Sequence, residues 1–412
     1  MVKDLYEKIV QLAKRRGFFW PAYEIYGGVG GLIALGPLGV LLKNNIIKKW
    51  RKLFVIPNQD FIVEIETPIL TPEKIFIASG HVEHFTDYIV ECLKCGRKYR
   101  ADHLLEEVLG IEGLEKYSER ELTEIIRKNN VKCPECGGEL SEVRKFNLLF
   151  KTTIGPYSEN IGYARPETAQ GMFTEFHRVH LIEGRKLPLG IAQIGKVFRN
   201  EISPRQGLIR LREFSLMEIE LFYDPLNPSC KKLSEVENEE LNIITAEMIR
   251  KGEKNPVTIT VREALAKKII LNEWNAYFMA LGKKFVESLG VPSEKQVFVE
   301  KLPEERAHYA LQTFDQMVEV SRWGAVEVSG HAYRGTYDLH RHAVYSGQDL
   351  RAFEPYPNPK KVKVVEVVPD RERIKEVFGD KAEYIIRAIM LQKGEEVLKE
   401  LREKGFIEVL ET

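Results

Sequence analysis

One stretch, from Leu189 to Asp224, constrains the fold of this chain more than any other segment. It reads as two long strands joined by a polar turn at residues 203–207, because Pro and Gly close together in a polar run mark a hairpin. Successive side chains of a strand point to opposite faces, so residue parity separates an apolar face from a charged one. The even positions of the returning strand include Arg210, Arg212, Phe214, Glu218 and Glu220. The sequence therefore predicts a stiff surface that presents guanidinium groups, carboxylates and an aromatic ring.

Two readings suit such a surface. Opposite charges can simply pair across the strands of a solvated hairpin. The order of the residues favours a nucleotide site instead, because Arg199 stands two places before Glu201 and further Arg residues and Phe214 follow the Pro/Gly loop. Guanidinium groups bind phosphate oxygens in bidentate fashion, and an aromatic ring can stack on a base.

Several motifs occur in the order that is found in one known family. Phe198-Arg199-Asn200-Glu201, followed by residues 202–205 and by Arg212-Glu213-Phe214, resembles motif 2 of the class II aminoacyl-tRNA synthetases. In its detail it resembles the glycyl-tRNA synthetases of archaeal and eukaryotic type. The other matching stretches are Gly36-Pro37-Leu38-Gly39 with Lys43-Asn44-Asn45, Ser79-Gly80-His81-Val82, Arg165-Pro166-Glu167-Thr168-Ala169-Gln170-Gly171, Ala307-His308-Tyr309-Ala310 and Tyr337-Asp338-Leu339. The resemblance covers nearly the whole chain.

The resemblance implies both a fold and an activity. The fold is α+β: a class II synthetase core with an antiparallel sheet flanked by helices, interrupted by zinc-binding and helical insertions. The activity is that of a glycine–tRNA ligase, which uses ATP and Mg²⁺ to convert glycine to glycyl-adenylate and transfers the glycyl group to the 3′ end of tRNA(Gly). Two alternatives stay open: a catalytically incompetent synthetase-like binding or accessory protein, and a class II ligase for another small amino acid.

The resemblance also implies roles for individual residues. Arg199 and Glu201 are the catalytic pair, with Arg199 on the α-phosphate and Glu201 orienting the nucleotide. For Glu167 the alternative is a carboxylate that complements a helix N-terminus, and for Glu327 it is a cross-strand charge partner. The implied ATP-binding residues are Arg199, Asn200, Glu201, Arg210, Leu211, Phe214, Glu327 and Val328, with Phe214 stacked on adenine and Glu327 holding magnesium or ATP. The residues implied to receive the glycine ammonium group are Glu167 and Glu218.

Two C-x2-C pairs, each followed by Gly, have the spacing of paired metal knuckles. Two such knuckles complete a tetrahedral zinc site, and four thiolates leave no position open for water, so the zinc is structural. Disulfides are the alternative, although a cytosolic chain keeps its thiols reduced. The predicted ligands are Cys92, Cys95, Cys133 and Cys136, while Cys230 stands outside the scheme. A modest basic cluster, Arg97, Lys98 and Arg100, is either a solvated face or, as the resemblance allows, a surface near the tRNA acceptor end.

Composition bounds the remaining possibilities. At 412 residues with 44% hydrophobic content, the chain can bury a sizeable core and form two or three domains. Lys+Arg and Asp+Glu both number 61, so tRNA contacts must come from local basic patches rather than from global charge. Residues 1–20 lack the features of a secretory signal, and the apolar run 27–42 is too short to cross a bilayer. We therefore expect a cytoplasmic protein without a membrane segment.

The chain divides into six expected regions. Residues 1–85 form the first segment of the catalytic core, with helices at 3–17 and 37–54, a glycine-rich segment 26–31 that is a bend rather than a phosphate loop, and a strand at 61–70. By resemblance to motif 1, the region around Pro68 makes a homodimer interface; an ordinary edge strand is the alternative. The other expected regions are the zinc-binding insertion 86–146, the second core segment with motif 2 at 147–225, a helical insertion at 226–300, the third core segment at 301–350, and a C-terminal insertion at 351–412.

Three local expectations complete the picture. Residues 146–153 read as one strand, and residues 303–323 match one helix, because apolar residues recur there at helical spacing. Residues 325–329 and 362–368 read as strands. The family's third motif, which carries an Arg for ATP and a Glu and Ser for glycine, is not found before Thr412, and neither is the anticodon-binding domain, so we expect a truncated chain that binds ligands and catalyses poorly.

Overall fold

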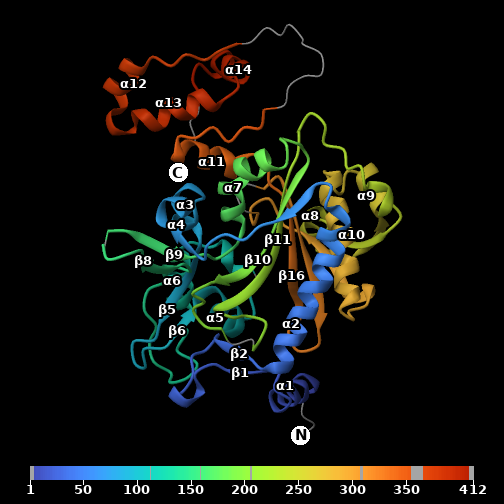
Figure 1. Cartoon of the computed structure of the whole chain (residues 1–412). Helices are drawn as coiled ribbons and strands as arrows, with labels where there is room; N and C mark the ends of the chain where they lie inside the picture. Colours follow the sequence, from blue (N-terminus) through green and yellow to red (C-terminus); the bar gives the residue numbers. More distant parts are fainter. Residues whose placement is uncertain are drawn as a thin grey trace.

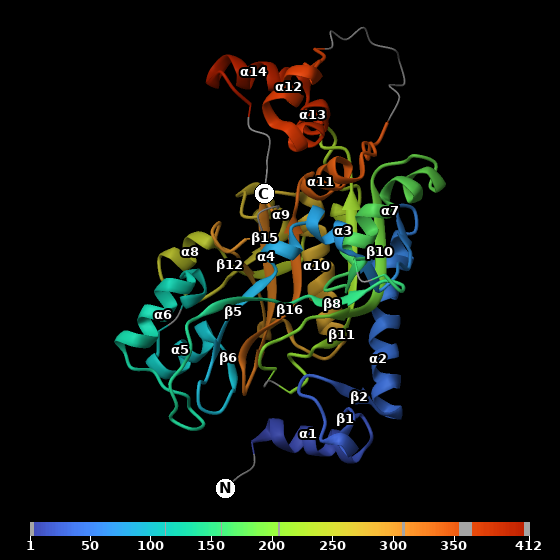
Figure 2. The same ribbon diagram turned by 90° about the vertical axis from the view of Figure 1, so that its left-hand side faces the viewer.

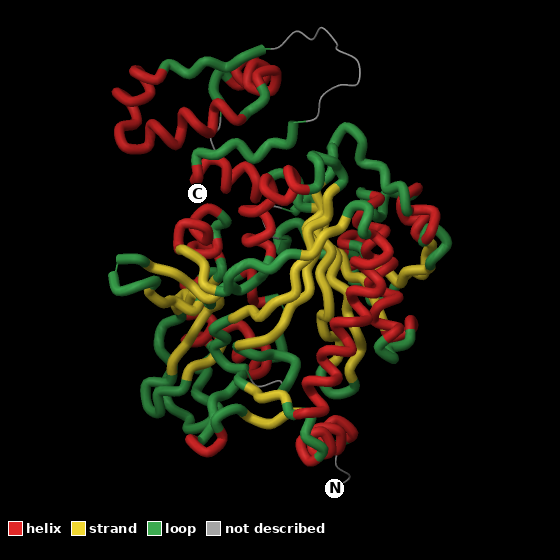
Figure 3. Tube along the Cα trace, viewed as in Figure 1, coloured by secondary structure: helices red, strands yellow, loops and turns green. Residues whose placement is uncertain are grey.

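The computed structural model describes residues 4–407 except 112, 158, 205–206, 307–309 and 354–364. Two sheets lie side by side at the centre, and helices cover them (Figures 1 and 3). The matching stretch 307–310 and the loop residue Arg205 therefore fall mostly or wholly outside the described residues. Among those residues, the α+β prediction of an antiparallel sheet flanked by helices is confirmed.

The predicted hairpin is present as β10 (Leu189–Phe198) and β11 (Glu213–Phe222). The two strands pair antiparallel without interruption, from Leu189 opposite Phe222 to Phe198 opposite Glu213. A short strand, β3 (Ile62–Glu64), pairs parallel with β10. The connection is longer than predicted, since residues 199–212 all lie between the strands. Residues 210–212 precede β11, so the parity argument applies only from Glu213 onward.

The second sheet has the order β13 (Val257–Thr260), β12 (Glu240–Ile244), β14 (Gln296–Glu300), β15 (Gln312–Val320) and β16 (Gly324–Tyr333). Only the β12–β14 pair is parallel. The helical interpretation of residues 226–300 was thus partly wrong, because three strands lie there beside α8 (Ala246–Arg250), α9 (Val261–Ala266) and α10 (Glu273–Ser288).

The helix predicted over residues 303–323 was also wrong, because β15 occupies its second half. Gln312, Phe314, Gln316 and Val318 are all buried, which is the period of two expected of a strand. The two glutamines hide this alternation in the sequence, whereas the apolar residues by themselves repeat at helical spacing. Pairing with β14 and β16 on either side decides the conformation.

The N-terminal region begins with α1 (Leu5–Arg15), followed by a small hairpin of β1 (Phe19–Pro21) and β2 (Ile33–Leu35). α2 (Pro37–Trp50) starts at a proline in its first turn, as predicted, and continues as a π-helical turn over residues 51–55. The strand expected at 61–70 is confirmed only at its two ends, as β3 and as β4 (Leu70–Pro72). Pro68 lacks a ladder donor, and it lies in the extended segment between them.

β4 pairs with β9 (Ile161–Ala164), which pairs in turn with β8 (Phe150–Thr153). The strand predicted over 146–153 is split between β8 and β7 (Arg144–Asn147). Two short helices, α3 (Glu73–Ala78) and α4 (His81–His84), lie beside them, and α7 (Ala169–Ile182) covers β10 and β11. The rings of Phe173 and Phe176 on α7 pack on Phe222.

The main core lies between the sheets, α2 and α10, where Trp274 and Tyr277 are buried among aromatic and aliphatic side chains. A separate apolar cluster, drawn from residues 90–143, fills the cysteine-bearing unit. This unit consists of β5 (Thr86–Glu91), β6 (Lys98–Arg100), α5 (Ala101–Leu109), α6 (Glu119–Lys128) and β7. Both helices lie between the two cysteine pairs in the sequence.

The C-terminal region contains α11 (Tyr337–Ser346), α12 (Arg371–Phe378), α13 (Ala382–Leu391) and α14 (Gly394–Lys404). The last three form a small unit at one end of the molecule (Figures 1 and 2). In the strand expected at 362–368, residues 362–364 lie outside the described residues and residues 365–368 are not a strand. Among the helices that the structure describes, none is both long and apolar enough to cross a membrane.

Candidate active site

Arg199 directly follows β10, and its backbone N–H donates to the carbonyl of Arg212 across the hairpin, 3.0 Å away. Its Nε donates to the carbonyl of Pro166 at 3.3 Å. The guanidinium carbon lies 5.4 Å from the ring centre of Phe214 and 5.7 Å from that of Phe85. Two aromatic rings thus lie within cation–π range of the predicted phosphate-binding group. The predicted phosphate and adenine contacts, Arg199 and Phe214, are neighbours in the structure.

Glu201 and Arg210 face each other across the loop, with Nη1 of Arg210 3.7 Å from Oε2 of Glu201. Burial raises the pKa of Glu201, while Arg210 acts to lower it. Arg212 plays a different role, because its guanidinium donates to the carbonyls of Glu201 and, at 2.6 Å, of Gly30. It fastens the glycine-rich segment to the loop. A side chain at Gly31, whose φ is +76°, would place its Cβ 2.7 Å from Pro204, which fits a close-packed bend.

Glu327 and Val328 lie on β16, as predicted for residues 325–329. Burial and the Asp315 charge raise the pKa of Glu327, whereas Lys301, Arg199 and Arg210 act to lower it. Glu327 is therefore close enough to the two arginines of the hairpin to feel their charge. The residues predicted to bind ATP are gathered from separate stretches of the chain.

Glu167 precedes α7, and two groups converge on its Oε1. Nε2 of Gln170 donates to it at 2.9 Å, and Nε2 of His81 lies at 3.6 Å. Burial opposes ionisation, but His81, Arg334 and Gln170 together hold the pKa of Glu167 below its usual range. Glu167 is a charged group in a largely buried setting.

Glu218, on β11, is the other carboxylate of the predicted glycine site. Its Oε2 accepts hydrogen bonds from the backbone N–H of Thr168, at 2.6 Å, and from the Thr168 hydroxyl. Burial and the Glu167 charge raise its pKa. Among the described residues, the hydrogen bonds and ion pairs of Glu167 involve Oε1 and those of Glu218 involve Oε2, so each carboxylate keeps one oxygen available. Two adjacent carboxylates of this kind suit an ammonium group.

The sequence did not reveal the polar groups that surround this pair. Glu220 lies beside Arg334, with Oε1 and Nη1 3.5 Å apart, and burial raises the pKa of Glu220 to about 8. Gln170, Asp338 and His342 are almost completely buried on α7 and α11. Two of them, Gln170 and Asp338, belong to stretches that match the family, which was the available signal. His342 lies outside the matching stretches, and it does not belong to the metal cluster.

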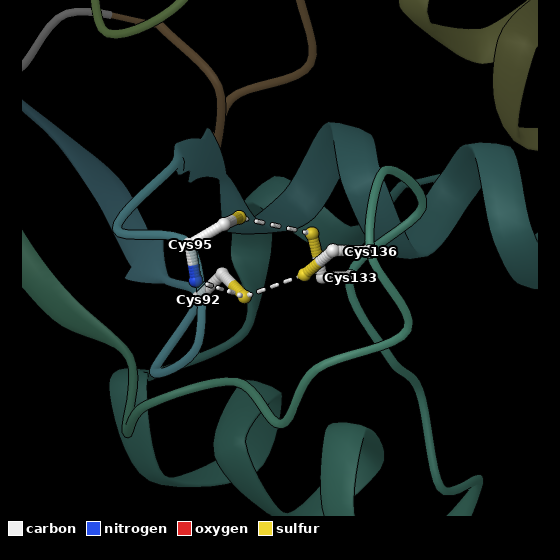
Figure 4. A group of neighbouring side chains, drawn as sticks. All are labelled: Cys92, Cys95, Cys133 and Cys136. Carbon is white, nitrogen blue, oxygen red and sulfur yellow. Dashed lines mark hydrogen bonds between the residues drawn. The ribbon is translucent and has the colours of Figure 1, made fainter.

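The four predicted cysteines meet at one point (Figure 4). All four Sγ atoms lie within 4.8 Å of one another, and the thiols are free rather than paired in disulfides. Each turn repeats the same backbone bond: Gly96 N–H donates to the carbonyl of Cys92, and Gly137 N–H to that of Cys133, both at 2.9 Å. Four converging thiols form a donor set that fits zinc, and such a site would be structural. Cys230 is buried elsewhere.

The basic cluster beside the knuckles is neutralised. Arg97 lies 2.6 Å from Glu135, and Lys98 lies 3.8 Å from Glu91. Arg100 lies 2.8 Å from Asp102 and also contacts Asp87. This pairing favours the ion-paired surface over an open nucleic-acid patch.

Comparison with known proteins places this geometry in a family. A model of the class II tRNA synthetase core domain (G, H, P, S and T) matches residues 158–299. The glycine–tRNA ligase of Aeropyrum pernix is 55% identical over 391 residues, covering 94% of this chain and 67% of that protein. That of Pyrococcus horikoshii is 46% identical over 409 residues, covering 98% and 71%.

Solved structures show a more distant similarity. Prolyl-tRNA synthetase of Giardia lamblia in complex with prolyl-adenylate gives a TM-score of 0.44 at 14% identity, covering 80% of this chain and 45% of that one. A similarity of this size carries no argument. The extent and identity of the matches to the archaeal ligases are sufficient by themselves: the chain belongs to the glycine–tRNA ligase family of class II synthetases.

Proposed function

We propose that this chain activates glycine with ATP and transfers it to tRNA(Gly). The observation that carries the proposal is the carboxylate pair Glu167 and Glu218, each with one available oxygen, of which Glu218 belongs to the hairpin that also carries Arg199 and Glu201. An ammonium group held by the pair has its own carboxylate within reach of a nucleotide phosphate. The family to which the chain belongs supports the same conclusion.

The chemistry has two balanced steps. A glycine carboxylate oxygen forms a bond to the α-phosphorus of ATP as the bond to pyrophosphate breaks, giving glycyl-adenylate. The terminal ribose hydroxyl of tRNA then bonds to the glycyl carbonyl carbon, its proton is lost, and AMP leaves. No enzyme nucleophile is needed, because catalysis consists of positioning and charge stabilisation.

Each hairpin residue has a proposed role in the first step. Arg199 neutralises charge that develops on the α-phosphate, and Glu201 orients the nucleotide, held in place by Arg210. Phe214 offers its ring to adenine. The remaining proposed nucleotide contacts are Asn200, Leu211 and Val328. Glu327 would hold Mg²⁺, whose charge neutralises the triphosphate.

Selectivity for glycine follows from the protein framework. A pocket sized for hydrogen excludes a larger side chain by overlap, which is easier than rejecting a smaller one. Gly195 shows how closely the framework is packed, since a Cβ there would lie 2.1 Å from Arg165 Nη2. We propose that alanine is excluded at the amino-acid site without an editing reaction.

The four-cysteine unit is proposed to bind zinc in a structural role. We propose residues 86–146 as its limits, supported by its separate apolar cluster. For residues 226–300 and 301–350 the shared sheet favours one unit over two. Reduced thiols fit the cytoplasm, which we propose as the compartment.

A homodimer formed through motif 1 is also proposed. The outer face of α2 exposes Leu38, Leu41 and Leu42, and the segment after Pro68 exposes Ile69 and Leu70. Exposed apolar side chains on both elements are the kind of surface that marks an interaction site. Sedimentation velocity at micromolar concentration tests the proposal: a dimer is expected, and Leu41→Glu should convert it to a monomer.

The experiment for the activity is ATP–pyrophosphate exchange with glycine, alanine and serine in parallel, followed by charging of tRNA(Gly). Exchange that depends on glycine alone supports the proposal. Exchange with another small amino acid would identify a different ligase, and ligand binding without exchange would identify a binding or accessory protein.

A further inference from the structure

The helix α11 buries polar residues to which the reaction assigns no role. Asp338 and His342 are 3% and 5% exposed, although each could have faced water on a surface helix. Buried polar groups are costly unless they are hydrogen-bonded, so their partners indicate what they do. Both side chains point to one residue of α7, Gln170, which is 1% exposed.

Both the nitrogen and the oxygen of the Gln170 side-chain amide make hydrogen bonds here. Nε2 donates to Oε1 of Glu167 at 2.9 Å and to Oδ1 of Asp338 at 3.2 Å. The carbonyl oxygen, Oε1, lies 2.7 Å from Nε2 of His342. An amide nitrogen carries two hydrogens and no acceptor, so two carboxylate oxygens account for both of them.

The direction of the third bond follows from the first two. With its nitrogen committed to the carboxylates, Gln170 presents only an acceptor to His342, so Nε2 of His342 must carry a hydrogen. Burial and the neighbouring Arg341 lower the pKa of His342 to about 4, so the ring is neutral near pH 7 and has this single hydrogen. Turning the amide around would set its oxygen against two carboxylate oxygens, which repel it.

Asp338 is fixed from its other side. Arg334 donates to both of its oxygens, with Nε and Nη2 each 3.0 Å away, and the Arg334 guanidinium lies 5.0 Å from the ring centre of Phe173 on α7. Each member of the set is therefore held by another member, and α7 and α11 are locked together around Gln170.

We infer that α11 is a positioning element for glycine recognition: His342 and Asp338 fix the amide of Gln170, which holds Oε1 of Glu167 and leaves Oε2 directed to the substrate ammonium group. The inference rests on the proposed function, in which Glu167 binds that group. Neither Gln170 nor His342 touches the substrate. Their contribution is to keep the carboxylate in one orientation before glycine arrives, which lowers the ordering cost of binding.

The test compares two substitutions at one position. In His342→Leu the donor to Gln170 is lost, whereas in His342→Gln an amide nitrogen can stand near the place of Nε2. Binding of a non-hydrolysable glycyl-adenylate analogue is measured by calorimetry, with sulfamoyl-adenosine, which lacks the glycyl group, as the second ligand. We expect His342→Leu to weaken the glycyl ligand about tenfold, as for loss of one hydrogen bond to a charged network, and to leave the other ligand within twofold.

His342→Gln should restore most of the glycyl affinity. Equal weakening of both ligands, or no difference between the Leu and Gln variants, overturns the inference. If His342→Leu fails to fold, Gln170→Glu replaces it. That change puts a carboxylate against Glu167 and Asp338, and it should produce the same ligand-selective loss.

A double-mutant cycle separates this inference from the proposed function. In a Glu167→Gln background, His342→Leu should have no further effect on the glycyl ligand, because the group it positions is gone. If Glu167→Gln alone leaves glycyl binding intact, the proposed function fails. If Glu167→Gln abolishes it while His342→Leu alone does not weaken it, only the positioning role fails.

Discussion

The two ends of the candidate active site are built differently. At the glycine end, Glu167 and Glu218 lie in a buried network in which Thr168, Gln170 and His81 fix one oxygen of each carboxylate. At the nucleotide end, the Arg199 side chain makes a single hydrogen bond among the described residues, at 3.3 Å to a backbone carbonyl, and otherwise lies near aromatic rings.

This difference reflects two recognition problems. Selecting the smallest amino acid requires a rigid pocket, and rigidity comes from hydrogen bonds that are already made. Binding a triphosphate requires strong positive charge whose hydrogen-bonding capacity is still available. The glycine end is consequently preorganised, whereas the nucleotide end keeps hydrogen-bond donors available for the triphosphate. The following predictions sharpen or break that comparison, from the largest expected effect to the smallest.

Glu167→Gln should have the largest effect. Removing one partner of a buried charge pair costs about 2–5 kcal/mol, so a glycyl-adenylate analogue should bind about 100-fold more weakly or worse. The melting temperature should fall as well, because the groups that hold the pKa of Glu167 low lose the charge that they stabilise, although relief of Glu218 offsets part of this loss. Calorimetry and thermal unfolding measure the two quantities. Glu175→Gln, an exposed change on α7, is the control, and an unaltered glycyl affinity would contradict the assignment.

Arg199→Ala and Arg212→Ala should separate function from structure on the same hairpin. The guanidinium of Arg199 is available to a ligand, so its loss should weaken ATP binding by about 2 kcal/mol and leave the melting temperature unchanged. The guanidinium of Arg212 donates hydrogen bonds to the carbonyls of Gly30 and Glu201, so its loss should lower the melting temperature. ATP titration and thermal scans check this. The comparison breaks if the two variants behave alike.

Removal of the metal should weaken ATP binding more than glycine binding, because the cysteine unit is connected to the nucleotide end of the site. The chain enters the cysteine unit after Phe85 and leaves it before Leu148. The Leu148 N–H donates to the carbonyl of Phe85, and the Asn200 N–H donates to the carbonyl of Leu148 at 2.7 Å.

We expect Cys133→Ser to lose bound zinc and to destabilise residues 86–146. It should also weaken ATP binding severalfold and change the affinity for the glycyl ligand little. Elemental analysis and hydrogen exchange follow the first two effects. Cys230→Ser serves as control and should keep its zinc. The metal site is refuted if the unaltered chain is purified without zinc and Cys133→Ser is equally stable.

The last prediction concerns the pH dependence of stability. The pKa of Glu220 is raised to about 8, so the folded chain holds a proton there that the unfolded chain releases near its ordinary value. The stabilisation by this proton is thus complete below the ordinary pKa of a glutamate and is lost as the pH rises through about 8. Over this range the free energy of unfolding falls by at most about 1.4 kcal/mol per pH unit. Glu220→Gln should flatten this decline between pH 5 and 8. Denaturant titrations measure it, with Glu213→Gln, a change at a partly exposed carboxylate, as the control; an unchanged slope would mean that Glu220 is ionised throughout.

Much of the fold could be predicted where local pattern and pairing agree. The hairpin of β10 and β11 and the cysteine cluster follow from alternation and spacing, because each depends on residues that are near in sequence or on a fixed ligand geometry. β15 could not be predicted, since its buried Gln312 and Gln316 look polar in the sequence. They are buried because Gln316 donates to Gln296 on β14 and Gln312 to the carbonyl of Ile269.

The sequence by itself determined the chemistry of this protein: which guanidinium groups, carboxylates and thiols are present, and in what order. The tertiary structure alone decided which of them are available. Arg199 and Arg212 look equivalent in the sequence, yet the guanidinium of Arg212 is already hydrogen-bonded to backbone carbonyls. Gln170 and His342 are 172 positions apart and are joined only by the packing of two helices. Hydrogen-bonding capacity depends on neighbours brought from distant regions of the chain, and in a buried site every donor that is already paired is unavailable to a substrate.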